Sequence, residues 1–163
     1  MTRVALVESL KKLVEEAVKD MELPVAVQKG DEETAVRTPE IYRMRLPDSS
    51  SAKKLAPYVI IQLIDSKQLF EAAPKPKYIA TVRFICCVYS KDESLGAISL
   101  LNLLDRIQIH LLKQLNIGGC FMLDMHEPFE ALIYPDDTAP YYAGELVGTF
   151  QLPPIQQEVN LDG

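Results

Sequence analysis

The sequence YIATVRFICCVYSKDESLGAISLLNLLDRIQIHLLKQL, which runs from Tyr78 to Leu115, decides the fold. It predicts a long strand, a short polar turn with the sequence KDES, and a long apolar helix. Successive strand residues point to opposite faces of a sheet, and here both sets are largely apolar, so packing is expected on each side. One face carries Tyr78, Ala80, Val82, Phe84, Cys86 and Val88, and the other carries Ile79, Thr81, Arg83, Ile85, Cys87 and Tyr89.

The helix that follows this strand carries more apolar surface than packing on one sheet face requires. A stripe roughly 100° wide is enough for such packing, and Leu103 and Ile109 widen the stripe beyond it. We therefore expect one part of the helix to build the core of the subunit. Another part, around Leu103 and Ile109, is expected to be buried by a neighbouring subunit.

The remaining segments predict one further helix and several strands. Apolar side chains recur at helical spacing through residues 6–21, with charged residues between them. We expect a single α+β domain over residues 1–155, in which a mostly antiparallel sheet packs against two helices, and a flexible arm at 156–163. The expected order is αβ(β)ββαββ, with strands at 24–28, 34–46 (weak), 57–64, 78–90, 120–134 (broken at Pro128) and 141–152. The expected caps are Thr2 for the first helix, and Asp92 or Ser94 and then Gly118-Gly119 for the second.

Two long polar connections are expected to be mobile contact segments, at about 30–51 and 66–76. The first contains the serine run at 49–51, and the second contains Phe70 and the prolines of PKPK. Loops this long inside a compact domain are usually functional or disordered. Arg37, Arg43 and Arg45 alternate through the weak strand. They indicate either a solvated strand face or a charged contact with a neighbouring subunit, where arginine is enriched.

The net charge of −6 and the pI of about 5.0 argue against a protein that grips nucleic acid. Such proteins carry a basic patch that neutralises phosphates, and the densest basic cluster here is only Arg43, Arg45, Lys53 and Lys54. An acidic wall along which DNA slides is compatible with the charge. No apolar run reaches the roughly 18 residues of a membrane span, and the N-terminus does not resemble a signal peptide, so a cytosolic protein is expected. The three cysteines, Cys86, Cys87 and Cys120, lack the spacing of a disulfide framework.

The sequence offers little to catalysis. No G-x-S-x-G, G-x-G-x-x-G or phosphate-binding loop occurs. His126 is the better of the two histidines, because Asp124 would share its face on a strand and Glu127 is adjacent, but the set is too small for a metal site. We therefore expect no enzyme activity, no cofactor and no metal. A small-ligand-binding or enzymatic α+β domain that uses these three residues is the alternative from a different class.

Several segments together resemble one protein family over residues 1–155. They are the N-terminal helix that ends in LPVAV, the strand PYVIIQL, the strand YIATVRFICCVYSKD with its apolar helix, and the closing PYYAGELVGTFQLP. The chain resembles the tail terminator proteins of long-tailed phages and prophages, also described as tail-completion or tail-to-head joining proteins. The resemblance lies in the pattern and order of the elements.

The resemblance implies a structural protein of the virion tail and neck that is made in the host cytoplasm. Six copies would form a ring that caps the tail tube and offers the surface for the head–tail connector or stopper protein. DNA would only pass through the lumen. Another neck, head-completion or minor capsid protein is the alternative from the same context. The expected contact residues are Arg43, Arg45, Phe70, Leu103, Ile109, Tyr141 and Tyr142.

Overall fold

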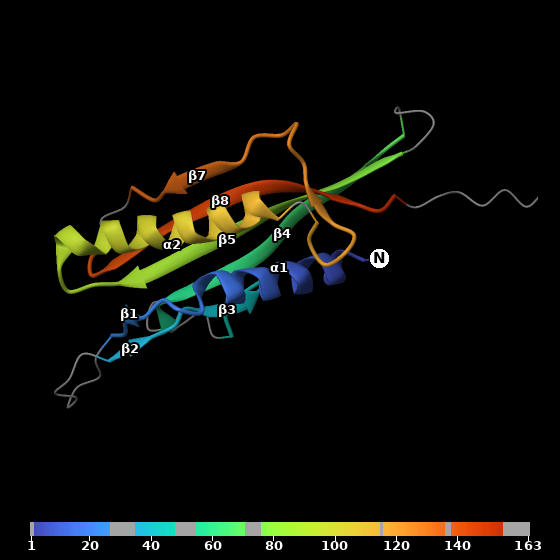
Figure 1. Cartoon of the computed structure of the whole chain (residues 1–163). Helices are drawn as coiled ribbons and strands as arrows, with labels where there is room; N and C mark the ends of the chain where they lie inside the picture. The colour runs from blue at the N-terminus through green and yellow to red at the C-terminus, as the bar shows by residue number, and fades with distance from the viewer. Residues whose placement is uncertain are drawn as a thin grey trace, which may run out of the picture.

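The computed structural model describes residues 2–26, 35–47, 55–70, 76–114, 116–135 and 138–154, and it shows an α+β fold (Figure 1). The predicted fold class is therefore confirmed. In chain order the elements are α1 (Arg3–Val18), β1 (Leu23–Pro24), β2 (Val36–Arg37), β3 (Glu40–Arg43), β4 (Tyr58–Leu69), β5 (Lys77–Tyr89), α2 (Glu93–Lys113), β6 (Met122–Leu123), β7 (Glu130–Ile133) and β8 (Tyr141–Leu152).

Within the described residues, the main sheet has six strands in the order β3-β4-β5-β8-β6, and β7 also pairs with β8. The pairs are antiparallel except for β3 and β4, which run parallel. The weak strand predicted at 34–46 is in fact two short strands, because β2 pairs with β1 in a separate two-stranded sheet. The strand predicted at 120–134 is likewise divided into β6 and β7, which pair with different parts of β8.

The hairpin of β4 and β5 is longer than the sequence predicts. The prediction places a connection at 65–77, but β4 continues to Leu69, which pairs with Lys77. The polar residues Asp65, Ser66 and Lys67 are paired with the well-defined strand β5 after a register shift at Leu63. Pairing with a strong neighbouring strand thus outweighs their low strand propensity. The hairpin extends beyond the helices as a long two-stranded arm (Figure 1).

Both helix starts follow the predicted chemistry, but the end of α2 does not. Thr2 caps α1 by accepting the Ala5 N–H at 3.2 Å, and Asp92 caps α2 by accepting the Ser94 N–H at 2.9 Å. The helix ends at Lys113, before the glycine pair. Gly118 and Gly119 instead have φ values of 60° and 85° in the turn between Ile117 and Phe121. Glycine is favoured there because positive φ is costly for other residues.

The main core lies between one face of the sheet and both helices, which lie on the same side of it (Figure 1). Phe84 of β5 and Phe150 of β8 are fully buried, and their rings meet edge to face with centroids 6.3 Å apart. Of the two faces of β5, the one with Ala80, Val82, Phe84, Cys86 and Val88 points into this core, and all five residues are 0% exposed.

The opposite sheet face is covered only at one end. A second cluster there joins Tyr58 and Ile60 of β4 to Cys87 and Tyr89 of β5, under Leu46, Ala56 and neighbouring residues. Arg37 holds this cover in place by donating to the carbonyl oxygens of Leu55 and Pro57, the latter at 3.0 Å. Arg37 therefore connects two segments of its own subunit through hydrogen bonds. The predicted solvated strand face does not describe Arg37, and the predicted contact with a neighbouring subunit stays a prediction.

Candidate interaction surfaces

The buried face of α2 contacts both the sheet and α1, which explains why the helix is so apolar. Its buried residues are Gly96, Leu100, Leu103, Leu104, Ile107 and Leu111, and α2 packs on α1, β5 and β8. Leu103 is 0% exposed within this core. The prediction that a neighbouring subunit buries Leu103 is therefore wrong, because the subunit itself buries it between the two helices and the sheet.

The opposite face of α2 carries a second apolar row, which we call the outer stripe. Ile98 is 53% exposed and Ile109, one of the predicted contact residues, is 48% exposed. By length and composition alone α2 is long and apolar enough to cross a membrane, but its other face is part of the protein core. The outer stripe consists of Leu95, Ile98, Leu101, Ile109 and Leu112.

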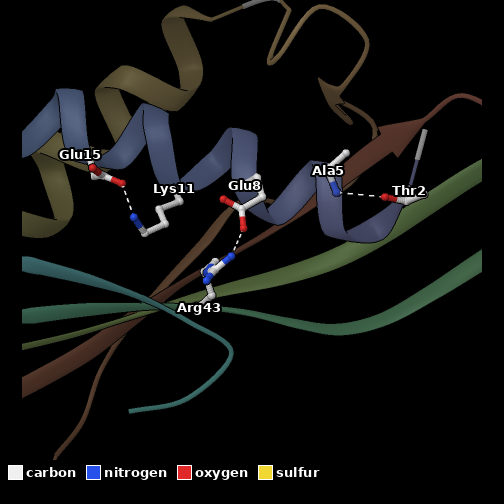
Figure 2. A network of polar contacts seen from close by, with 6 residues as sticks. All are labelled: Thr2, Ala5, Glu8, Lys11, Glu15 and Arg43. Atoms are coloured by element: carbon white, nitrogen blue, oxygen red, sulfur yellow. Dashed lines mark hydrogen bonds and ion pairs between the residues drawn. The ribbon is translucent and has the colours of Figure 1, made fainter. Parts of the chain in front are cut away.

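An apolar groove of about 500 Å³ lies at the N-terminal end of α1, beside β3 and β4. Val4 and Met44 are exposed at this groove, and Met44 adopts a positive φ of 65°. Arg43 extends from β3 to form an ion pair with Glu8 of α1 across the groove (Figure 2). Arg45 follows the Met44 turn and is exposed. Of the two predicted arginines, Arg43 therefore lines the groove and is bound to its own subunit, whereas Arg45 is not among the lining residues.

The end of β4 is the most exposed apolar part of the hairpin. Phe70, a predicted contact residue, is 73% exposed, and Leu69 and Ile64 are also exposed. The hairpin arm on which Leu69 lies extends past both helices (Figure 1), and none of these three side chains belongs to a core cluster. An aromatic ring at such a position has no partner among the described core clusters.

Tyr141 and Tyr142 lie on opposite faces of β8, so they do not form one contact patch. The Tyr141 ring packs on Tyr89 with centroids 5.4 Å apart, and its pKa is raised mainly by burial. The Tyr142 ring lies over Gly96 of α2, where an added Cβ would stand 2.1 Å from the ring. Both rings are half-buried in their own subunit.

The carboxylate of Asp124 does not join His126 and Glu127 in a polar site. These residues follow β6 in a turn rather than on a strand, so the predicted shared face is wrong. Asp124 is buried and pairs with Lys77 Nζ at 2.8 Å, while its other oxygen accepts the His126 N–H at 3.0 Å. Burial by itself raises the pKa of Asp124, but Lys77 and the His126 N–H outweigh it and lower the pKa below its ordinary value.

The His126 and Glu127 side chains are exposed. In the parts of the chain that the structure describes, no group of three or more histidine, cysteine or carboxylate residues is placed to hold a metal ion. The alternative hypothesis, a small-ligand-binding or enzymatic domain that uses Asp124, His126 and Glu127, therefore loses Asp124, which is engaged in an internal ion pair.

Sequence reasoning missed several exposed apolar residues. Leu95 and Ile98 belong to the outer stripe, and the spacing of three residues from Leu95 to Ile98 and from Ile98 to Leu101 was a readable signal. Leu132 and Ile133 are exposed on β7, an edge strand. Nothing in their local sequence distinguishes an edge strand from a central one, because the position of a strand depends on the whole sheet.

Comparison with known proteins gives no family for this chain. No family model and no curated protein matches it. One solved structure, named only by an identifier, is 14% identical and has a TM-score of 0.46, and the match covers 96% of this chain and 99% of that one. A likeness at this level identifies neither a family nor a function.

Proposed function

We propose that this protein is a structural virion-assembly subunit: a tail terminator that caps the tail tube as a ring and provides the head–tail joining surface. This proposal rests on one observation: large exposed apolar side chains form several separate groups on the surface of one small fold. They occupy the outer stripe of α2, the end of the β4–β5 hairpin, the groove beside α1 and the edge strand β7. Apolar patches on several sides are typical of subunits that other subunits cover.

The hairpin arm is the element that we assign to the tail tube or the connector. It extends from the body of the subunit, and Phe70 at its end offers a large apolar ring to a partner. Aromatic side chains are frequent anchors in protein interfaces because they bury much area at little entropic cost. Arg43 and Arg45 would supply polar contacts at a second position, beside the α1 groove.

The charge of the chain supports the same proposal. A net charge of −6 does not favour tight binding of DNA phosphates. A ring that lets DNA pass through its lumen must bind it weakly, and an acidic subunit meets that requirement. The resemblance described above supplies the specific role, and the exposed surfaces supply the physical means, which is assembly through buried interfaces.

The test is tube capping with purified components. The protein is mixed with tail tube protein of the same phage or prophage during polymerisation, and tube length is measured by electron microscopy. Wild-type protein is expected to shorten the tubes and to form a ring at one end. Phe70→Glu is expected to lose capping, because a buried charge weakens an apolar contact. Met125→Glu changes an equally exposed apolar residue elsewhere on the fold and should still cap.

Two results would count against the proposal. If the tubes keep their length and the wild-type protein binds nowhere on them, the protein is not a tail terminator. Binding of the protein to purified head connectors alone, with no effect on tubes, would instead favour a head-completion role.

A further inference from the structure

Four of the five residues of the outer stripe are arranged symmetrically about the midpoint between residues 103 and 104. Leu95 lies as far before the midpoint of residues 103 and 104 as Leu112 lies after it, and Ile98 is matched in the same way by Ile109. Asn102 and Asp105 form the innermost matched pair on this face. The surface along the stripe is thus apolar at both ends, and at its centre Asn102 and Asp105 lie beside Leu101, whose matched residue is Arg106.

The matched pairs share one direction around the helix axis, and this direction points away from the core. With about 3.6 residues per turn, the direction halfway between the matched residues is opposite to the side that carries Leu100, Leu103 and Ile107. Ile98 and Ile109 lie close to that outward direction and are about half exposed. The symmetric row is therefore on an exposed face of α2, where Asn102, Asp105 and Ile109 line a hollow beside residues 21–23 of the same subunit.

We propose that the outer stripe binds the outer stripe of a second copy of this chain, with the two α2 helices antiparallel about a two-fold axis near residues 103 and 104. In this register Ile98 of each copy lies level with Ile109 of the other, and Leu95 lies level with Leu112. An interface in which the same patch serves both copies is the usual form of a two-fold dimer.

The polar centre of the stripe fits a second copy of the chain. Asn102 of one copy lies level with Asp105 of the other, so the amide N–H donates to the carboxylate, once in each direction. The two Asp105 carboxylates also approach each other at the axis, and their repulsion keeps the association reversible. Lipid tails would leave Asn102, Asp105 and Arg106 without hydrogen-bond partners at the middle of the contact, which is costly.

This pairing goes beyond the proposed function and does not rest on it. Neighbours around a closed ring of six contact each other through two different patches, whereas the α2 pair uses one patch twice. The pair would join two free subunits, or two rings face to face. A chain that forms no ring would still pair in this way.

The first test is the mass of the protein in solution, measured by light scattering over a concentration series. Wild-type protein is expected to reach the mass of a dimer. Ile98→Glu is expected to raise the dimer dissociation constant at least about a hundredfold, because a charge is buried at the contact. Ile64→Glu, an equally exposed site on β4, is the matched control and should leave the dimer intact. Circular dichroism confirms that both variants are folded.

The second test fixes the orientation by disulfide cross-linking. In a Cys120→Ser background, chains carrying I98C are mixed with chains carrying I109C and oxidised. The mixture should cross-link, whereas either variant alone should not. In the antiparallel pair, the two copies of position 98 are separated by eleven residues of rise, about 16 Å, and a disulfide needs Cα atoms within roughly 7 Å. The native Cys86 and Cys87 are buried and should not interfere.

Several outcomes would overturn the proposal. A monomer at every concentration excludes the dimer. Cross-linking of each variant with itself but not with the other indicates a parallel pair, and a dimer or larger oligomer unaffected by Ile98→Glu places the contact elsewhere. A monomer that binds phospholipid vesicles, and loses that binding in Ile98→Glu, assigns the stripe to a lipid surface instead.

Discussion

Removal of the Lys77 ammonium should change both the stability of the protein and its dependence on pH. The substitution is Lys77→Met, which keeps the length and apolar stem of the side chain. Asp124, whose side chain is fully buried, would then keep the hydrogen bonds from the His126 N–H and the Gln151 side chain but lose its ion pair. The carboxylate would stand in a low-dielectric environment without a cation.

The expected cost in the free energy of unfolding is about 3 kcal/mol at neutral pH. Removing one partner of a buried ion pair typically costs about 3–5 kcal/mol, because the other charge remains buried and uncompensated. The lower end applies because the Lys77 side chain is itself 33% exposed, so water screens part of the attraction. In Lys77→Met/Asp124→Asn the neutral amide needs no cation. We therefore expect the double variant to recover most of this loss.

The pH dependence should reverse in sign. In the wild type the pKa of folded Asp124 is lowered. Its contribution is therefore fully present above the unfolded pKa, near 4, and is lost as the pH falls through the folded pKa. In Lys77→Met burial is no longer opposed by the ammonium, and the folded pKa should exceed the unfolded one. That variant should therefore gain stability as the pH falls from 7 towards 5.

The assay is urea denaturation followed by circular dichroism at a series of pH values. The slope of stability against pH between 5 and 7 is compared for the wild type, Lys77→Met and the double variant. A Lys77→Met protein that loses less than about 1 kcal/mol, the value of an exposed pair, would refute the reasoning. So would a slope of the wild-type sign in that variant, since the carboxylate would then have found another counter-charge.

Two further predictions concern packing and thiol access. Gly96→Ala should lower the free energy of unfolding by roughly 1–3 kcal/mol, because the new Cβ overlaps the Tyr142 ring. In a Tyr142→Ala background the same change should be neutral or stabilising. Equal melting temperatures for the wild type and Gly96→Ala would contradict the predicted overlap. Native protein should react with a thiol reagent at Cys120, which is partly exposed, and not at Cys86, whose pKa is raised by burial. Mass spectrometry identifies the labelled cysteines. Fast labelling of Cys86 before denaturation would show that the core is open to the reagent.

Much of the fold follows from local sequence patterns. The strand predicted at 141–152 has the bounds of β8, and one of the two predicted faces of β5 is the face that packs on the helices. Alternation along a strand and helical spacing are local properties, so they are readable in a single chain. The caps Thr2 and Asp92 are equally local, because each accepts an N–H only a few residues away.

The surfaces were less predictable than the elements. Phe70, Arg45 and Ile109 are exposed as a contact role requires, but Leu103 is buried and the two tyrosines divide between opposite faces. Helical spacing shows that α2 has excess apolar residues, but it does not show how much of that excess α1 covers. That amount depends on the position of α1 on the sheet, which no local pattern contains.

The sequence by itself determined the α+β class, the two helices and the long strands, because these depend on short-range periodicity and capping. Only the tertiary structure decided the parallel pairing of β3 with β4, the extension of β4 to Leu69, and the Lys77–Asp124 pair. These features join residues far apart in the chain. Their free energy comes from burial and pairing that exist only once the whole sheet has formed.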